Sequence, residues 1–193
     1  MSEWSAETAR WYADRYGEYA TNRITVDALD LSPDAVIVDV GCGTGSALRR
    51  VAKRVPRGML LGVDPTPQML EIARERAARH PEGRRIEFRE GSAEKLPVDS
   101  AYADLVFAFD SIDHWQDKSA GLAEIRRVLL PQGRLVVVKD DCLPGVAKAK
   151  RVFLNELGRA DFRVLDEQVL TEGDVSCTMW ICGIAERGSA FIC

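Results

Sequence analysis

The sequence has few of the residues that build metal sites and disulfide frameworks. Its 193 residues include two histidines, His80 and His114, and five cysteines at irregular spacing. An odd number of cysteines without a repeated spacing argues against a disulfide framework, and neither histidine belongs to a cluster with metal-ligand spacing. Cys177 and Cys182 are an odd number of residues apart in one predicted strand, so they should point to opposite faces. We therefore expect reduced, free thiols and no bound metal.

The sequence also lacks a basic excess and a long apolar run. It carries 26 basic and 30 acidic residues, which give a formal net charge of -4. A protein whose main partner is nucleic acid or an anionic membrane would show a basic excess or a basic stripe. The apolar stretches are shorter than the roughly 20 residues of a membrane-spanning helix, and the charged N-terminal residues fit no signal peptide. We expect a cytoplasmic monomer or homodimer that acts on small molecules and binds neither nucleic acid nor membranes.

What the sequence does contain is a regular alternation of strand-like and helix-like segments. Its length is that of one domain, and no repeat, low-complexity tract or linker interrupts it. We expect a single domain over residues 1–193. Helices should occupy residues 1–30, a ligand-binding core residues 35–140, and a helix with a C-terminal hairpin residues 141–193.

The apolar patterns predict an α/β fold. Five segments read as strands, over residues 36–40, 59–64, 85–90, 103–109 and 134–139, and Pro131 with Gly133 should end the helix before the fifth. A helix over residues 146–158, with Gly158 as its C-terminal cap, precedes two strand-like segments that should pair as an antiparallel hairpin. Strands that alternate with helices predict a mostly parallel, doubly wound sheet with helices on both faces.

A glycine-rich turn follows the first predicted strand, in the stretch VDVGCGTG. In a doubly wound sheet, ligands bind beyond the carboxyl ends of the strands near this position. Gly41, Gly43 and Gly45 would let the backbone turn sharply and approach a ligand closely. A dinucleotide fingerprint needs its third glycine one residue later, where this chain has Ser46. The spacing therefore disfavours NAD.

Two acidic residues favour a nucleoside cofactor other than NAD. Asp39 precedes the first glycine, where a carboxylate would repel a pyrophosphate by about 4 kcal/mol per charge at about 4 Å and an effective dielectric near 20. The same carboxylate would attract an ammonium group. Asp64 ends the second strand about 20 residues beyond the glycines, where a carboxylate can accept both ribose hydroxyls. A cofactor with an ammonium group, a sulfonium, a ribose and an adenine but no phosphate fits both acids, and S-adenosylmethionine is such a cofactor. The alternative for Asp64 is a cap for the helix that begins near Pro67.

These motifs resemble those of a known enzyme family. The stretches VDVGCGTG, GVDPTPQML, GSAEKLP, ADLVFAFDSIDHWQD and EIRRVLLPQGRLVVV are similar to segments of the class I S-adenosylmethionine-dependent methyltransferases, especially the small-molecule branch of ubiquinone and menaquinone biosynthesis. The resemblance covers about residues 35–140. It implies a Rossmann-like sheet of seven strands in the order 3-2-1-4-5-7-6, with the last strand antiparallel.

The resemblance also implies which residues contact the cofactor. Asp39 and the glycines would lie along its methionine end, Asp64 would hold the ribose, and Pro65 with Thr66 would flank the adenine. The family loop that corresponds to GSAEKLP usually has an aspartate after its glycine, and Ser92 replaces it here. A neutral hydroxyl forms a weaker contact with the adenine amino group, which Ala93 and Glu94 could share. The complete set of expected cofactor contacts is Asp39, Gly41, Cys42, Gly43, Gly45, Asp64, Pro65, Thr66, Ser92, Ala93, Glu94, Phe109, Asp110 and Tyr16.

Methyl transfer makes modest demands on catalytic residues. The leaving group is a neutral thioether, so alignment of the two reactants is the main requirement, and a base is needed only for a protonated acceptor. His114 and Asp110 follow the fourth strand and are the candidates for a catalytic role. Asp110 could instead contact the methionine part of the cofactor. The N-terminal helix, with Arg15 and Tyr16, could fold over the cofactor as a lid or pack on the sheet edge.

The acceptor and its pocket stay open at this point. One helix fits between the fifth and sixth strands, with no inserted cap to build an acceptor pocket. The pocket walls could come from the N-terminal helices or a second subunit, or the site could be open. A cofactor-binding protein without catalysis is the alternative function. A nicotinamide-dependent oxidoreductase is the third, which the glycine spacing and Asp39 disfavour.

Overall fold

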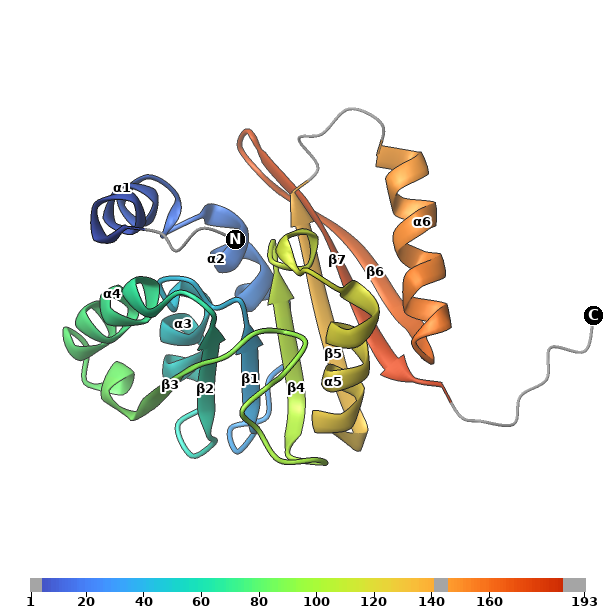
Figure 1. The fold of residues 1–193 in the computed structure, drawn as a ribbon, viewed down its shortest axis with the longest axis horizontal. Helices are drawn as coiled ribbons and strands as arrows, with labels where there is room; N and C mark the ends of the chain where they lie inside the picture. Colours follow the sequence, from blue (N-terminus) through green and yellow to red (C-terminus); the bar gives the residue numbers. More distant parts are fainter. Residues whose placement is uncertain (1–4, 141–145, 186–193) are drawn as a thin grey trace, which may run out of the picture.

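The computed structural model describes residues 5–140 and 146–185, of which residues 146–149 are described by their backbone alone. The first four residues of the predicted N-terminal region and the last eight of the C-terminal region lie outside this part. One sheet of seven strands forms the centre of the molecule (Figure 1), in the order β3-β2-β1-β4-β5-β7-β6. The predicted strand order is therefore confirmed.

The first five strands are parallel, and β7 is antiparallel to both of its neighbours. The strands are β1 (Ile37–Val40), β2 (Leu60–Asp64), β3 (Ile86–Glu90), β4 (Ala103–Phe109), β5 (Leu129–Asp140), β6 (Phe162–Glu172) and β7 (Val175–Ile184). All four residues of β1 are buried, as expected for a central strand with both faces covered.

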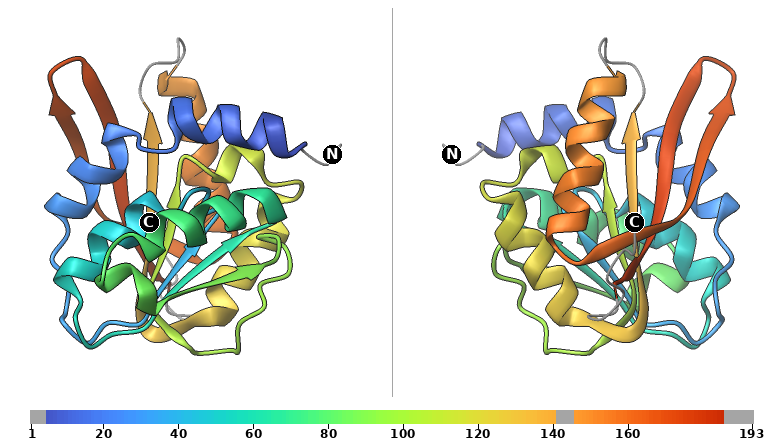
Figure 2. Two further views of the ribbon diagram at one scale, coloured as in Figure 1. Left: turned by 90° about the vertical axis from the view of Figure 1, so that its left-hand side faces the viewer. Right: turned by 90° about the vertical axis from the view of Figure 1, so that its right-hand side faces the viewer.

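Helices cover both faces of the sheet (Figure 2). They are α1 (Ala6–Tyr16), α2 (Ala20–Ala28), α3 (Ser46–Arg54), α4 (Pro67–Ala78), α5 (Lys118–Val128) and α6 (Val146–Arg159), with short 3-10 helices η1 (Glu82–Arg85) and η2 (Ile112–His114). One apolar core joins the sheet to α2, α3 and α4, and a second joins it to α5 and α6. Cys177 belongs to the first core and Cys182 to the second, so the prediction that they face opposite sides is confirmed.

Two predicted boundaries are wrong. The fifth strand begins at Leu129 rather than at residue 134, because Leu129 pairs with Ala103 before an irregular stretch delays regular pairing until Arg134. Gly158 is not a C-terminal cap. It lies inside the last turn of α6, and the residue beyond the helix with a positive φ of 59° is Asp161.

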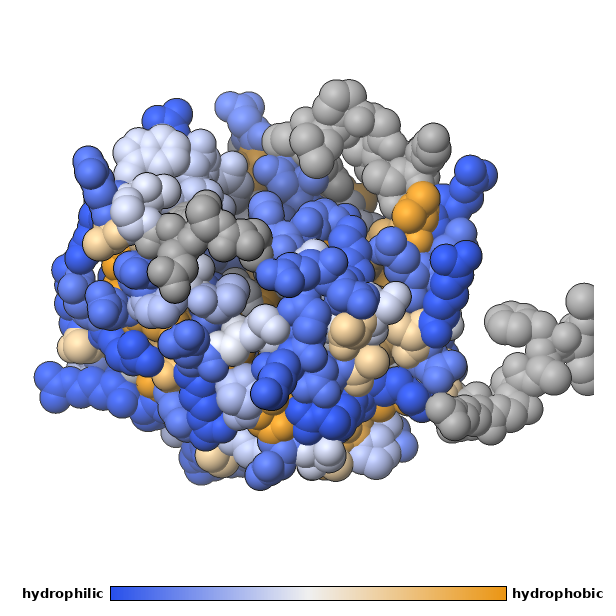
Figure 3. Space-filling view, in the orientation of Figure 1, coloured by the Kyte–Doolittle hydropathy of each residue, from blue (hydrophilic) through white to orange (hydrophobic). Residues whose placement is uncertain are grey.

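The outermost strand, β6, is the most exposed part of the sheet. Its apolar residues Val164, Leu165 and Val169 are 38%, 41% and 65% exposed. On the face turned toward the viewer in Figure 3, the hydrophobic residues that reach the surface are scattered among hydrophilic ones. Within the described residues, no helix has the length and apolar character needed to cross a membrane.

Candidate functional site

The glycine-rich turn connects β1 to α3 with a backbone that requires glycine. Gly41, Gly43 and Gly45 have φ angles of 77°, 51° and 71°. The N–H groups of Gly41 and Cys42 both donate to the carbonyl of Val63, at 2.8 and 3.1 Å, which ties the turn to β2. A Cβ on Gly45 would lie 2.9 Å from the ring of Phe88. The predicted sharp turn is therefore present, at the carboxyl end of the central strand.

Asp39 is a buried carboxylate beneath this turn. The residue is 3% exposed, and its carboxylate has no hydrogen bond or ion pair within the part of the chain that the structure describes. Burial, with a smaller contribution from the charge of Asp64, raises the pKa of Asp39 to about 7. A buried carboxylate without a donor costs free energy when it is ionised. A cationic ligand would supply the missing partner.

Asp64 ends β2 and holds the two loops that surround it. One carboxylate oxygen accepts from the N–H of Gly43 at 3.0 Å, and the other accepts from the N–H of Thr66 at 2.9 Å. Burial raises the pKa of Asp64, and these hydrogen bonds oppose the shift. Each carboxylate oxygen can accept a second hydrogen bond, so Asp64 can hold both loops and still accept from a ligand. The loop with Pro65 and Thr66 leads directly into α4, which has Pro67 in its first turn.

Asp110 follows β4 with a positive φ of 49°, which is uncommon for a residue other than glycine. Its carboxylate accepts from the N–H of Asp140 at 2.9 Å and from the hydroxyl of Thr21 at 3.2 Å. It therefore joins the ends of β4 and β5 to α2. Burial raises the pKa of Asp110. The preceding residue, Phe109, is 8% exposed and stacks on Phe107 at a ring distance of 4.7 Å.

The loop after β3 carries the residues expected near adenine. Ala93 is buried, and Ser92 is partly exposed and forms an isolated bridge with Lys95. Glu94 has a structural contact that the sequence did not suggest: its carboxylate accepts from the N–H groups of Gln116 and Asp117, at 2.7 and 3.1 Å. Burial opposes the ionisation of Glu94, but these hydrogen bonds prevail and lower its pKa.

His114 lies at the end of η2, and its side chain is exposed. Its neighbour Asp113 is held by two cations: Lys118 Nζ and Lys139 Nζ each approach the carboxylate to 2.7 Å. These contacts outweigh the effect of burial and lower the pKa of Asp113. The structure therefore places His114 near the ends of β4 and β5, while the base role proposed for it stays a prediction.

The N-terminal helices lie over the glycine-rich turn. Figure 2 shows α1 across the edge at which the parallel strands end. Ala9 and Ala13 of α1 pack against Met69 and Ile72 of α4. Burial, followed by the charge of Asp110, raises the pKa of the Tyr12 phenol, so this ring lies beside the predicted site.

The connection between α1 and α2 is bonded directly to the turn. Thr44 Oγ1 donates to the carbonyl of Gly17 at 2.6 Å, and Ser46 Oγ donates to Glu18 at 3.2 Å. The Glu18 carboxylate also pairs with Arg49 and, at 3.0 Å, with Arg76. Sequence reasoning missed Glu18, because its partners are 28 to 58 residues away and nothing in the local pattern marks them.

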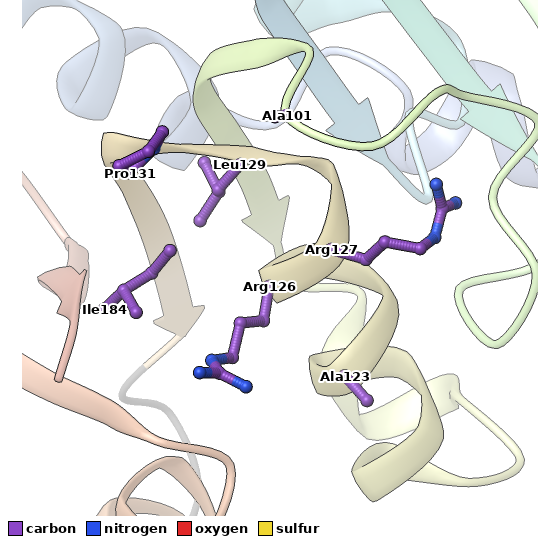
Figure 4. A pocket seen from close by; sticks show the side chains of 7 residues that line it. All are labelled: Ala101, Ala123, Arg126, Arg127, Leu129, Pro131 and Ile184. Atoms are coloured by element: carbon purple, nitrogen blue, oxygen red, sulfur yellow. The ribbon is translucent and has the colours of Figure 1, made fainter. Parts of the chain in front are cut away.

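A shallow hollow of about 300 Å³ lies at the end of the parallel strands opposite to the glycine-rich turn (Figure 4). Its lining residues are Ala101, Ala123, Arg126, Arg127, Leu129, Pro131 and Ile184. The Arg127 guanidinium turns away from it and binds Glu124 and the carbonyl of Val98. This hollow lies beside the beginnings of β4 and β5, far from the glycine-rich turn. Within the described residues, no group of three or more His, Cys, Asp or Glu side chains could hold a metal ion.

Residues 38–137, just over half of the chain, match the methyltransferase domain family. The chain belongs to this family. An O-methyltransferase of Pyrenophora dematioidea is 34% identical over 132 residues, which are 65% of this chain and 49% of that protein. A ubiquinone/menaquinone biosynthesis C-methyltransferase of Hahella chejuensis is 32% identical over 134 residues, which are 68% of this chain and 54% of that protein.

The solved structures agree with the fold. The crystal structure of a SAM-dependent methyltransferase from Aquifex aeolicus superposes with a TM-score of 0.74 and 17% identity, and the match covers 94% of this chain and all of that one. The expected resemblance to class I methyltransferases of the ubiquinone and menaquinone branch is confirmed. The chain spans about half the length of the curated relatives it matches.

Proposed function

We propose that this methyltransferase domain binds S-adenosylmethionine at the carboxyl edge of β1, β2 and β4 and transfers its methyl group to a small-molecule acceptor. The single observation that carries the proposal is the buried carboxylate of Asp39 below three glycines of positive φ. The turn lets a ligand approach the backbone, and the carboxylate favours a ligand with a positive charge. A pyrophosphate would meet repulsion at the same place.

The residues present fit the cofactor. Asp39 would face its ammonium group, Asp64 would accept from the ribose hydroxyls, and the N–H groups of the glycine-rich turn would border its methionine end. Pro65, Thr66, Ser92 and Ala93 would border the adenine, and Tyr16 of α1 would cover the site with its neighbours. When bound, the cofactor supplies an electrophilic methyl group on a sulfonium.

The chain's own residues would align and enclose the reactants. Asp110 holds α2 and β5 together at the end of β4, and the bonds of Glu18 keep α1 and α2 over the turn. Such positioning supplies much of the rate acceleration of a displacement reaction. The exposed His114 is the candidate base for an acceptor that arrives protonated. Relatives named as O- and C-methyltransferases both match this chain, so the accepting atom is not fixed by likeness.

Calorimetric titration tests the proposal. S-adenosylmethionine and S-adenosylhomocysteine should bind, and NAD should not. Asp39→Asn should weaken both sulfur nucleosides at least tenfold, because a charge-assisted contact with the ammonium group is lost. Binding of NAD, or no heat with either sulfur nucleoside, would overturn the proposal. Binding without turnover over a broad panel of acceptors would favour the alternative of a non-catalytic cofactor-binding protein.

A further inference from the structure

A groove beside the proposed cofactor site has an aromatic side and an acidic side, and the proposed function assigns it no role. It has a volume of about 330 Å³ and is lined by Glu18, Tyr19, Ala20, Asp140, Asp174 and Val175. These residues come from three places: the connection between α1 and α2 with the first residue of α2, the end of β5, and the turn between β6 and β7 with the first residue of β7. The sequence left the source of the acceptor pocket open, and the structure brings these three segments together.

Two hydrogen bonds connect the groove to the surroundings of the proposed cofactor site. Its residue Glu18 accepts from Ser46 at the start of α3, directly after the glycine-rich turn. Its residue Asp140 donates its N–H to Asp110 at the end of β4. One wall is thus one hydrogen bond from Asp110 of the proposed cofactor site, and the other is one hydrogen bond from the residue that follows the glycine-rich turn. Contacts of α2 with β6 and β7 hold the hairpin beside the N-terminal wall.

Tyr19, on the aromatic side of the groove, is the last of three neighbouring tyrosine rings. Tyr19 is 40% exposed and lies 6.0 Å from Tyr16, which in turn lies 5.0 Å from Tyr12. The ring of Tyr12 is near Asp110. A row of neighbouring rings that leads from the groove toward the reaction site favours a planar, aromatic occupant, because aromatic pairs prefer ring distances of about 4.5 to 7 Å.

The polar side of the groove is acidic. Its three charged lining residues are carboxylates, and lysine and arginine are absent from the lining formed by the described residues. Arg49 and Arg76 compensate the charge of Glu18 from the side of α3 and α4. Asp174 has no ion pair within the described chain. An exposed tyrosine ring beside a carboxylate is a surface that attracts a cation, by charge and by the face of the ring.

We propose that this groove is the acceptor subsite and that it takes an aromatic compound with a protonated amine. The inference rests on the proposed function, because the groove gains its meaning from the cofactor site beside it. The ring would stack on Tyr19, the amine would face Asp174 and Asp140, and the nucleophilic atom would extend toward the ends of β4 and β5. An aromatic carboxylate of the same size would meet like charge.

Three ligands with one ring and different side chains test this proposal on protein loaded with S-adenosylhomocysteine. Tyramine is cationic, 4-ethylphenol is neutral, and 4-hydroxyphenylacetate is anionic. Tyramine should bind about tenfold more tightly than 4-ethylphenol, because its amine is attracted both by the carboxylates and by the face of the tyrosine ring. The anion should bind most weakly. Asp174→Asn should reduce the affinity for tyramine about two- to fivefold and leave that for 4-ethylphenol unchanged.

Matched variants separate the two walls. Tyr19→Ala should weaken tyramine and 4-ethylphenol alike, and Tyr19→Phe should restore both. Asp99→Asn, which removes an exposed carboxylate from the loop before β4, should change nothing. Equal or tighter binding of the anion, no binding of any of the three ligands, or equal effects of Asp174→Asn and Asp99→Asn would overturn the inference while the proposed function stands. Failure of S-adenosylhomocysteine to bind would remove both.

Discussion

At the scale of single residues, Asp39 combines a requirement of ligand binding with a cost to folding. Its pKa is about 7 in the folded protein, whereas the ordinary value of an aspartate, which applies to the unfolded chain, is 3.8. Because the folded pKa is the higher of the two, the folded protein holds the proton more tightly, and stability falls as pH rises from about 4 to about 7. Asp39→Asn should therefore raise the free energy of unfolding at pH 8 by about 2 to 4 kcal/mol.

Urea denaturation of the ligand-free protein measures this gain. The advantage of Asp39→Asn over the unsubstituted protein should be small at pH 4 and grow up to pH 7. The control is Asp34→Asn, which removes an exposed carboxylate paired with Arg57 and should give no stabilisation at pH 8. A variant of Asp39 that is less stable than the parent protein at pH 8 would contradict this explanation.

The same carboxylate predicts the pH dependence of cofactor binding. A cationic ammonium group favours the ionised form of Asp39, so binding below pH 7 should release a proton from it. The affinity for S-adenosylhomocysteine should rise between pH 5.5 and pH 7.5 and then level off. Titrations in buffers of different ionisation enthalpy measure the proton count, and Asp39→Asn should abolish the release. An affinity independent of pH in this range would argue against the contact.

Two glycines should respond to alanine in opposite directions. Gly45 has a φ of 71°, and a Cβ there would lie 2.9 Å from the Phe88 ring, so Gly45→Ala should cost about 1 to 3 kcal/mol of stability. Gly158 is helical, and apart from its chain neighbours and the nearby backbone of α6 no described atom lies within 4 Å of an added Cβ, so Gly158→Ala should gain about 0.5 to 1 kcal/mol. Thermal unfolding of both variants checks the pair, and a destabilised Gly158→Ala would refute the helical assignment.

At the scale of elements, α1 is predicted to act on cofactor binding rather than on the sheet. It packs on α4 through a small apolar contact and brings Tyr12 to the site. A variant without residues 1–16 leaves Glu18 and α2 in place, and its affinity for S-adenosylhomocysteine should fall at least tenfold through loss of the cover. Circular dichroism should show the remaining fold intact. Unchanged affinity would reduce α1 to a helix packed at the edge of the sheet.

The elements also show what a sequence can and cannot predict. Strands such as β1 and β4 were predictable within a residue, because a strand buried on both faces is a near-continuous apolar run. The early start of β5 was not, because it depends on the pairing of Leu129 with Ala103 across the sheet. The glycines and Asp39 could be found because their signal is a local spacing. The contacts of Glu18 and Thr21 could not, because their partners are distant in the sequence.

At the scale of the whole molecule, binding of the cofactor should stabilise the fold. A ligand at a hundred times its dissociation constant adds about 2.7 kcal/mol to the free energy of unfolding. For a chain of this size, that corresponds to a rise of about 5 to 11 °C in the melting temperature. Differential scanning fluorimetry with S-adenosylhomocysteine should show this rise, and NAD should leave the melting temperature unchanged. Equal shifts with both compounds would contradict the assignment of the site.

The exposed edge strand β6 bears on how copies of the molecule meet. Its free backbone groups and its three exposed apolar side chains would permit another strand to extend the sheet. If two copies aligned β6 antiparallel over their full length, Phe162 would oppose Glu172 and the two Glu167 side chains would face each other at the centre. Like charges directly opposite one another disfavour such a pair. The two carboxylates at the middle of β6 therefore disfavour a dimer formed through this edge, and the ion pair of Glu167 with Lys150 offsets part of that cost.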